Sequence, residues 1–103
     1  LGHEKCSKMI LDRLGDNPIY VTFDLDCLDP TVAPGVANIE SAFRGFNIDE
    51  ARKLLQSLKG RNVIGGDVAC LMPTKDSPNN ITSMVAAAVM FEIICLISVN
   101  LKK

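Results

Sequence analysis

Two short runs of almost continuously apolar residues constrain the fold of this chain more than any other feature. Residues 19–25 read IYVTFDL, and residues 62–71 read NVIGGDVACL. Runs of this length without regular polar alternation are typical of strands that are buried on both faces, as in a parallel sheet. A helical pattern lies between the two runs, so the order strand, helix, strand predicts a parallel pair joined by a crossover helix.

Three segments with helical spacing of apolar residues accompany the two strands. They span residues 3–14, 48–58 and about 81–98. In the first segment, the apolar residues that we expect to face the core are Cys6, Met9, Ile10 and Leu14. In the second, Asn47 is the expected N-cap, because an asparagine side chain accepts a hydrogen bond from the first helical turn. The chain therefore predicts an α/β architecture of two strands and three helices.

The third helical segment is long and apolar enough to raise the question of a membrane span. Residues 81–99 read ITSMVAAAVMFEIICLISV, close to the length of about 20 residues that a bilayer requires. The polar residues that interrupt this run are Ser83, Glu92 and Ser98. We therefore interpret it as a buried helix outside any membrane, with Asn80 or Thr82 as its expected cap.

The length of the chain is small for the sheet that it predicts. Two strands that are buried on both faces need neighbouring strands on both sides of the pair, and 103 residues do not supply them. We therefore expect residues 1–103 to be a partial domain, the C-terminal portion of a larger doubly wound α/β fold. The lack of an initiator methionine at the start agrees with this expectation.

The charge and the cysteine content narrow the range of partners. The net charge is −1, from 11 basic and 12 acidic residues, which provides no basic surface for nucleic acid or an anionic membrane. The four cysteines contain no CxxC pair, which disfavours a zinc ribbon or a redox motif. We expect Cys27, Cys70 and Cys95 to be reduced thiols in apolar surroundings, which indicates an intracellular, cytoplasmic location.

Three aspartates follow the first strand and form the most informative cluster in the sequence. Asp24, Asp26 and Asp29 stand at the carboxyl end of that strand, and Asp67 stands late in the second strand. Ligand sites of parallel α/β proteins lie at this edge of the sheet. Strand alternation places Asp24 and Asp26 on the same side, with Leu25 opposite. Two carboxylates at such close range need a cation or a shared proton between them.

Two interpretations of this cluster follow from its spacing alone. No Arg or Lys lies within the strand, so a hard divalent cation with oxygen ligands, Mg²⁺ or Mn²⁺, fits the pair of carboxylates best. The alternative is turn chemistry, because Asp29-Pro30 is a common turn dipeptide. The Asp-x-Asp motif is short and common, so its spacing leaves both interpretations open.

A longer string around the cluster resembles the signature of the arginase/agmatinase family of ureohydrolases. It reads TFDLDCLDPTVAPG over residues 22–35. The positions that match in order and spacing are Thr22, Phe23, Asp24, Asp26, Asp29, Pro30, Pro34 and Gly35. Further along the chain, NVIGGDVACLMPTKD and the helix that begins ITSMVAAA resemble the last strand and the last helix of the family. The agmatinase branch is the most similar.

The resemblance implies a three-layer α/β/α parallel-sheet fold of the arginase type, of which this chain holds about two strands and three helices. It also implies a binuclear Mn²⁺ site in which Asp24 bridges the two ions and Asp26 ligates one of them. The residues that it implies for the neighbouring loop are Asp29, Pro30, Pro34 and Gly35. The implied reaction is hydrolysis of a guanidino C–N bond to urea and an amine. The implied substrate is a small guanidino compound such as agmatine, and the full-length form is expected to be a homo-oligomer.

Three departures from the family pattern weaken the implied site. The family takes further His and Asp ligands from an earlier part of its chain, and the single histidine here, His3, is expected to be solvated. Where the family carries a Glu that binds the guanidinium group, this chain has Cys70. The loop over residues 36–45 also differs, and Glu40 in it is either a solvated charge or a substitute carboxylate. We therefore expect the chain to be inactive alone, with two metal ligands and no catalytic residue of its own.

Two rival interpretations remain beside that of an agmatinase-like ureohydrolase fragment. One is a non-catalytic, degenerate ureohydrolase-like protein, because Cys70 and the 36–45 loop depart from the family pattern. The other is a haloacid-dehalogenase-like phosphohydrolase, with Asp24 as its nucleophile and Mg²⁺ as its cofactor. That family expects Thr or Val two residues after the second aspartate, where this chain has Leu28.

Overall fold

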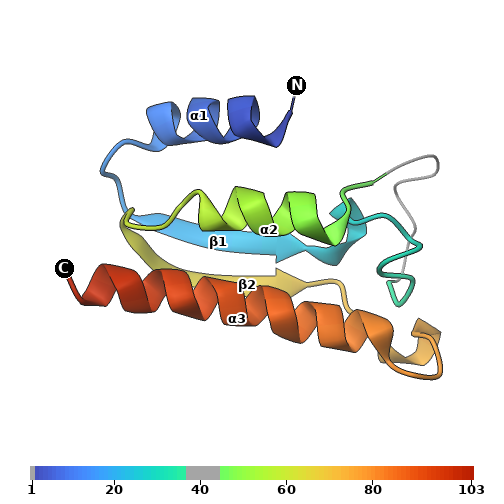
Figure 1. Cartoon of the computed structure of the whole chain (residues 1–103). Helices are drawn as coiled ribbons and strands as arrows, with labels where there is room; N and C mark the ends of the chain where they lie inside the picture. The colour runs from blue at the N-terminus through green and yellow to red at the C-terminus, as the bar shows by residue number, and fades with distance from the viewer. Residues whose placement is uncertain (1, 37–44) are drawn as a thin grey trace.

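The computed structural model describes residues 2–36 and 45–103, which form an α/β unit around one parallel pair of strands (Figure 1). Its elements are, in chain order, α1 (His3–Leu14), β1 (Ile19–Asp24), the 3₁₀ turn η1 (Leu25–Cys27), α2 (Ile48–Gln56), β2 (Val63–Ala69), the 3₁₀ turn η2 (Pro73–Lys75) and α3 (Ile81–Leu101). The strands pair in parallel, from Ile19 opposite Val63 to Asp24 opposite Ala69. The predicted order of strand, crossover helix and strand is therefore confirmed.

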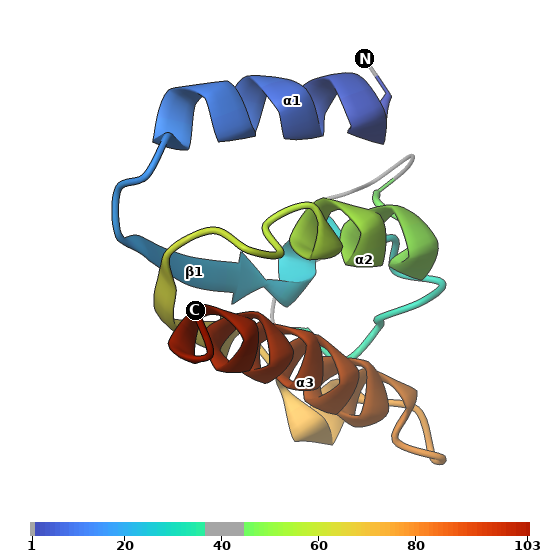
Figure 2. The same cartoon turned by 60° about the vertical axis from the view of Figure 1, so that its left-hand side comes forward.

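The two helices α2 and α3 cover the same face of the sheet, and α1 packs beside α2 (Figure 2). Val21, Phe23 and Val68 turn toward this helical layer and pack against the core. On the opposite face, Tyr20 and Thr22 are exposed. Two-sided burial was expected from the apolar runs, but no element of the described residues covers this second face.

Two clusters of buried side chains form the core. The larger cluster joins η1, the loop after it, α2 and α3, and its most buried members are Leu25, Leu28, Ala33 and Ile93. The smaller cluster joins the starts of the strands to the turn after α2 and to the C-terminal half of α3, and it consists of Ile19, Leu58, Val63 and Leu96. Because the fully buried Leu25 stands between Asp24 and Asp26, the larger core cluster anchors the acidic turn.

A glycine allows β2 to lie close to α3. A Cβ atom on Gly66 would lie 2.6 Å from Cγ2 of Ile93 and 2.8 Å from the backbone oxygen of Val21. Contacts this short are well inside van der Waals separation. The glycine in the apolar run of the second strand is therefore a packing requirement.

The first helix buries a different stripe from the one that its apolar residues predicted. Met9 and Ile10 are exposed, at 61% and 45%. Ser7 is buried, and Leu11 and Leu14 pack against the smaller core cluster. The prediction is therefore wrong for Met9 and Ile10. The face of α1 that points toward the core carries Ser7, Leu11 and Leu14.

The N-terminus of α2 has the predicted cap. The side chain of Asn47 accepts a 2.8 Å hydrogen bond from the backbone N–H of Glu50, and the Glu50 carboxylate accepts one of 3.1 Å from the backbone N–H of Asn47. This reciprocal pair is a capping box. It fixes the residue at which the helix begins. The helix ends at Gln56, slightly before the predicted bound.

The N-terminus of α3 is capped by a residue that the sequence reasoning missed. Asn80 has a left-handed backbone (φ 59°) and makes no side-chain cap. Instead, the Asp76 carboxylate accepts hydrogen bonds of 2.9 Å from the backbone N–H groups of Thr82 and Ser83. Burial raises the pKa of Asp76, but the hydrogen bonds from Thr82, Ser83 and Ser77 outweigh it and hold this pKa well below its ordinary value. The prediction of Asn80 or Thr82 as the cap is therefore wrong.

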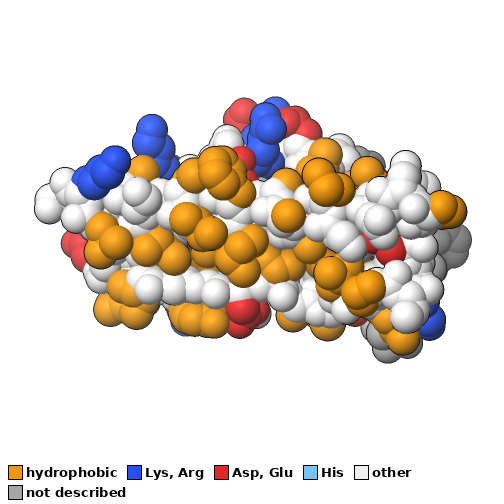
Figure 3. All heavy atoms as spheres, turned by 90° about the horizontal axis from the view of Figure 1, so that it is seen from below, with side chains coloured by type: hydrophobic (Ala, Val, Ile, Leu, Met, Phe, Trp, Pro, Cys, Tyr) orange, Lys and Arg blue, Asp and Glu red, His pale blue; other side chains and the backbone are white. Residues whose placement is uncertain are grey.

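The outer face of α3 is apolar along much of its length (Figure 3). Its exposed large side chains are Ile81, Met84, Phe91, Ile94 and Leu101. The helix is long and apolar enough to cross a membrane, a test that the core helices of soluble proteins also pass. Its inner side chains, by contrast, are buried in the core, and they include Val85, Val89, Ile93 and Leu96. The predicted core role is thus found on the inner face of the helix.

Candidate metal centre

Asp24 and Asp26 stand on either side of the point where β1 ends. Asp24 is the last residue of the strand, and Asp26 lies in η1. The backbone N–H of Asp26 donates a 2.9 Å hydrogen bond to Oδ1 of Asp24. Leu25, expected opposite them in a continuing strand, instead begins the turn. The two carboxylates therefore come together because the chain turns, and the argument from strand alternation is wrong at this point.

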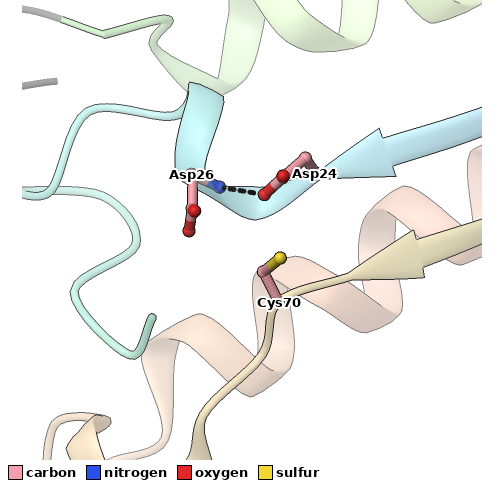
Figure 4. Close-up of side chains that lie close together, drawn as sticks. All are labelled: Asp24, Asp26 and Cys70. Carbon is pink, nitrogen blue, oxygen red and sulfur yellow. Dashed lines mark hydrogen bonds between the residues drawn. The ribbon is translucent and has the colours of Figure 1, made fainter. Parts of the chain in front are cut away.

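Cys70 reaches the same edge of the sheet from the second strand. Because Asp24 lies opposite Ala69 in the parallel register, the residue after β2 falls beside the acidic turn. One ligand atom each from Asp24, Asp26 and Cys70 lies within 4.8 Å of the other two. The three side chains turn toward a shared space (Figure 4). Cys70 has a left-handed backbone, with φ of 74°, so the chain bends out of the strand where its sulfur enters this space.

The surroundings of Cys70 differ from the apolar ones that its sequence neighbours predicted. Its side chain is exposed, whereas Cys27 and Cys95 are partly buried. A side-chain hydrogen bond with Asp24 raises the pKa of the Cys70 thiol, and desolvation and the charges of Asp24 and Asp26 raise it further. The prediction for Cys70 is wrong because it follows the apolar run of the strand, while the residue itself lies beyond the strand end. All four cysteines are free thiols.

Asp29 is engaged in the loop that follows the acidic turn. Its Oδ1 accepts hydrogen bonds from the backbone N–H of Thr31 at 2.9 Å and from the Thr31 hydroxyl at 2.7 Å. Its Oδ2 accepts a longer one, of 3.5 Å, from the backbone N–H of Gly45. Pro30 follows it in this turn. Asp29 is not one of the three residues whose ligand atoms converge.

Gly35 ties the same loop to the start of α3. Its backbone N–H donates a 2.8 Å hydrogen bond to the hydroxyl oxygen of Thr82, and its carbonyl accepts one of 2.7 Å from the backbone N–H of Met72. A Cβ atom on Gly35 would lie 3.0 Å from Cα of Asp76. The preceding Pro34 accepts a 2.9 Å hydrogen bond from the backbone N–H of Val36. The loop is therefore fastened to the segment that follows β2.

Asp67 takes part in a separate network on the exposed face of the sheet. Its carboxylate accepts hydrogen bonds from the Tyr20 hydroxyl at 2.9 Å and from the Thr22 hydroxyl at 2.7 Å. The hydrogen bond to Asp67 raises the pKa of Tyr20. Asp67 is thus a cross-strand partner of β1, outside the convergent group of ligand atoms. The sequence reasoning missed this network, although the register that pairs Thr22 with Asp67 would reveal it.

Two further residues from the sequence predictions lie outside the convergent group. His3 is the first residue of α1 and borders an open groove between α1 and α2. Glu40 lies outside the described residues, together with the rest of residues 37–44. Both alternatives for Glu40 therefore stay predictions.

The convergent group fits one divalent cation better than two. Over residues 2–36 and 45–103, Asp24, Asp26 and Cys70 are the one set of at least three Asp, Glu, His or Cys residues with ligand atoms this close. Two carboxylates suit a hard cation, and a sulfur suits a softer one. Three side chains match the protein ligands of a single ion with one open position. Two ions need more ligands than the described residues bring together.

Comparison with known proteins assigns the family. The sequence model of the arginase family matches residues 1–96. This chain belongs to the arginase family. An agmatinase of Photorhabdus laumondii is 39% identical to it over 87 residues, which cover 84% of this chain and 27% of the relative. This arginase-family chain thus spans about a quarter of the length of the curated relatives that it matches.

Solved structures of the family show the same arrangement of elements. A hypothetical agmatinase from Burkholderia thailandensis superposes with a TM-score of 0.84 at 36% identity, over 92% of this chain and 29% of that one. The proclavaminate amidino hydrolase of Streptomyces clavuligerus superposes with a TM-score of 0.89 at 29% identity, over 97% and 33%. The predicted arginase-like α/β fold is therefore confirmed, and the haloacid-dehalogenase interpretation of this arginase-family chain is not retained.

Proposed function

We propose that this chain supplies two metal-binding carboxylates to a ureohydrolase of the agmatinase type. The observation that carries the proposal is the meeting of Asp24 and Asp26 at the carboxyl end of a parallel strand, in a chain of the arginase family. Open α/β sheets bind their ligands at this edge. The agmatinase and amidino hydrolase relatives support a guanidino compound, such as agmatine, as the substrate class.

The proposed reaction is hydrolysis of a guanidino C–N bond, which yields urea and an amine. Divalent cations at such a centre, Mn²⁺ in this proposal, would supply a nucleophile from water at neutral pH and would stabilise the tetrahedral intermediate. In this scheme Asp24 and Asp26 would hold the metal. The backbone N–H of Asp26 orients Asp24, and Asp29 holds the loop beside them.

The same proposal implies that the isolated chain does not turn over. A binuclear centre needs ligands beyond Asp24 and Asp26, and we propose that a longer polypeptide supplies them, with residues 1–103 as its C-terminal portion. A homo-oligomer and a cytoplasmic location are part of the same proposal. The chain spans 27% of the P. laumondii agmatinase, which leaves most of that relative to carry the remaining ligands.

A non-catalytic role is the second candidate function, and Cys70 is the observation that favours it. Its thiol lies beside Asp24 and Asp26, at the position where the family resemblance expects a guanidinium-binding Glu. A neutral thiol does not replace a carboxylate against a cation. Loss of one partner of a desolvated charge pair costs about 2–5 kcal/mol, which corresponds to about one and a half to over three decades in affinity.

A grafting experiment tests the ureohydrolase proposal and separates the two candidates. The matching part of this chain replaces the corresponding 87 residues of the P. laumondii agmatinase, which supplies the rest of the domain. With Mn²⁺ and agmatine, the graft is expected to release urea, and Cys70→Glu in the graft is expected to raise the rate at least about tenfold. Cys95→Ser, a substitution in α3, is the matched control and should leave the rate unchanged.

Two results would decide against the proposal of an active enzyme. If neither the graft nor its Cys70→Glu variant releases urea while both retain bound metal and a folded structure, the segment does not support ureohydrolysis. If only Cys70→Glu is active, the non-catalytic candidate is favoured for the chain with its own cysteine.

A further inference from the structure

The three ligand atoms at the sheet edge are of two chemical kinds. Asp24 and Asp26 offer carboxylate oxygens, Cys70 offers a sulfur, and these atoms lie within 4.8 Å of one another. Mn²⁺ and Mg²⁺ suit oxygen ligands, whereas thiolates select softer ions such as Zn²⁺. A centre that includes the cysteine therefore discriminates between Mn²⁺ and Zn²⁺ in a way that two carboxylates alone do not.

We propose that Asp24, Asp26 and Cys70 together bind one thiophilic divalent cation of the Zn²⁺ type. Cys70 then acts as a metal ligand, in place of a side chain that anchors the substrate. This inference rests on the metal role proposed above for the two aspartates, and it changes which ion they take. Binding replaces the S–H bond of Cys70 with a sulfur–metal bond. The proton passes to the solvent, and no electron is transferred.

The separation of the ligand atoms is close to what one ion requires. Zinc binds carboxylate oxygen at about 2.0–2.2 Å and thiolate sulfur at about 2.3 Å, so two ligand atoms of one tetrahedral zinc ion lie about 3.3–3.7 Å apart. Ligand atoms as far apart as the described upper limit of 4.8 Å therefore close by roughly 1 Å when they bind the ion. Asp24 and Cys70 are exposed, so their side chains have the freedom to make this movement.

The surrounding backbone limits the directions from which the three ligands approach the ion. The hydrogen bond from the Asp26 backbone N–H orients the Asp24 carboxylate, as hydrogen bonds to metal-bound carboxylates commonly do. The left-handed backbone of Cys70 sets the direction in which its side chain leaves the chain. Three ligands leave the fourth tetrahedral position open for water or a small donor, which is the pattern of catalytic zinc sites.

Such an ion would also join the two strands. Asp24 ends β1 and Cys70 follows β2, so one bound cation bridges the carboxyl ends of both strands. A ligand that binds only the folded state raises the free energy of unfolding with the logarithm of its concentration over its dissociation constant, and the temperature of unfolding rises with it. The proposal therefore predicts stabilisation by Zn²⁺ that depends on Cys70.

Co²⁺ is the spectroscopic probe for the test, because cobalt–thiolate bonds give a charge-transfer band in the near ultraviolet. The 103-residue chain and the agmatinase graft are each titrated with Co²⁺, Zn²⁺ and Mn²⁺. The variants are Cys70→Ser and the control Cys95→Ser. We expect the cobalt band in the parent and in Cys95→Ser, and its loss in Cys70→Ser. We also expect the ratio of Zn²⁺ to Mn²⁺ affinity to fall at least about tenfold in Cys70→Ser, together with the thermal stabilisation by Zn²⁺.

The comparison between variants matters because most sites bind Zn²⁺ more tightly than Mn²⁺ whatever their ligands. A cobalt band that survives in Cys70→Ser, or a Zn²⁺ to Mn²⁺ ratio that Cys70→Ser does not change, would overturn the proposal. Absence of any cobalt–thiolate band in both the chain and the graft would do the same. If the Cys70→Ser variant of the isolated chain does not fold, the metal titrations of the graft decide the test.

The outcome is separable from that of the proposed function, since the cobalt band needs no turnover. A graft that releases urea with Mn²⁺ but shows no cobalt–thiolate band overturns this inference and leaves the ureohydrolase proposal standing. A graft that shows the cobalt band but releases no urea with any of the three metals overturns the ureohydrolase proposal and leaves this inference standing.

Discussion

The hydroxyl oxygen of Thr82 accepts a 2.8 Å hydrogen bond from the backbone N–H of Gly35. Thr82 is fully buried, so water does not replace this acceptor if it is lost. A Cβ atom on Gly35 would lie 3.0 Å from Cβ of Thr82, which shows how closely the Gly35 backbone approaches the Thr82 side chain. The loop after the acidic turn is thus fastened to the first turn of α3 through one hydroxyl group.

Replacement of that hydroxyl by a methyl group tests the contact. Thr82→Val keeps the shape of the side chain but leaves the buried N–H of Gly35 without its acceptor. Unsatisfied buried donors cost about 1–3 kcal/mol, so we expect the free energy of unfolding in urea to fall by that amount. Thr82→Ser keeps the hydroxyl and is the control. If the valine variant is as stable as the parent while the serine variant is weaker, packing and not the hydrogen bond holds the loop.

The capping carboxylate of α3 predicts a pH dependence of stability. The pKa of Asp76 in the folded state is lowered from 3.8. A carboxyl group with a depressed folded pKa stabilises the fold above its unfolded pKa, and this contribution is lost as the pH falls below that value. We therefore expect the stability of the parent to decline from about pH 4 downward more steeply than that of Asp76→Asn.

Urea unfolding between neutral and acidic pH measures the difference between these two proteins. At neutral pH, Asp76→Ala should be less stable than the parent, because the backbone N–H groups of Thr82 and Ser83 lose their acceptor. Asp12→Asn, an exposed substitution in α1, controls for the loss of one carboxylate. Parallel pH profiles for the parent and Asp76→Asn would contradict the prediction.

The order of elements was predictable from sequence because each signal is local. Apolar runs mark β1 and β2, and Asn47 with Glu50 marks the start of α2. The cap of α3 was missed because Asp76 acts from six positions before Thr82, beyond the spacing of an ordinary N-cap. The buried face of α1 was predicted wrongly. The surface against which α1 packs decides which of its faces is buried, and the apolarity of Met9 and Ile10 does not.

The candidate metal centre was predictable only in part for a related reason. The Asp24 and Asp26 pair is visible in the sequence as a motif. The approach of Cys70 depends on the register that pairs Asp24 with Ala69, and a register between two strands is a non-local property. The apolar run that contains Cys70 predicted burial, yet its left-handed backbone carries it out of the strand.

The close approach of β2 and α3 predicts a strong penalty at one glycine. In Gly66→Ala the new Cβ would lie 2.6 Å from Cγ2 of Ile93 and 2.8 Å from the backbone oxygen of Val21. Overpacking of this kind costs about 1–3 kcal/mol, which chemical unfolding would measure. Gly2→Ala is the control, because a Cβ there meets nothing within 4 Å. Equal losses in the two variants would show that the cause is the backbone and not the contact with α3.

The last prediction concerns the two faces of α3. Ile93 is 1% exposed in the larger core cluster, whereas Phe91 is 65% exposed on the outer face. A lysine at position 93 buries an unpaired charge, so Ile93→Lys should lower the free energy of unfolding by more than about 4 kcal/mol. Phe91→Lys should change it by no more than about 0.5 kcal/mol and increase solubility, since it breaks the apolar outer face.

Chemical unfolding followed by circular dichroism, with the protein in aqueous buffer, distinguishes these two substitutions. We expect a large loss of stability in Ile93→Lys and almost none in Phe91→Lys, because only one face of α3 lies in the core. If both lysine variants remain folded and both lose partitioning into detergent micelles to the same degree, α3 interacts with lipid around its whole circumference. If Phe91→Lys unfolds the protein and Ile93→Lys does not, the orientation of α3 against β2 is the reverse of the one described.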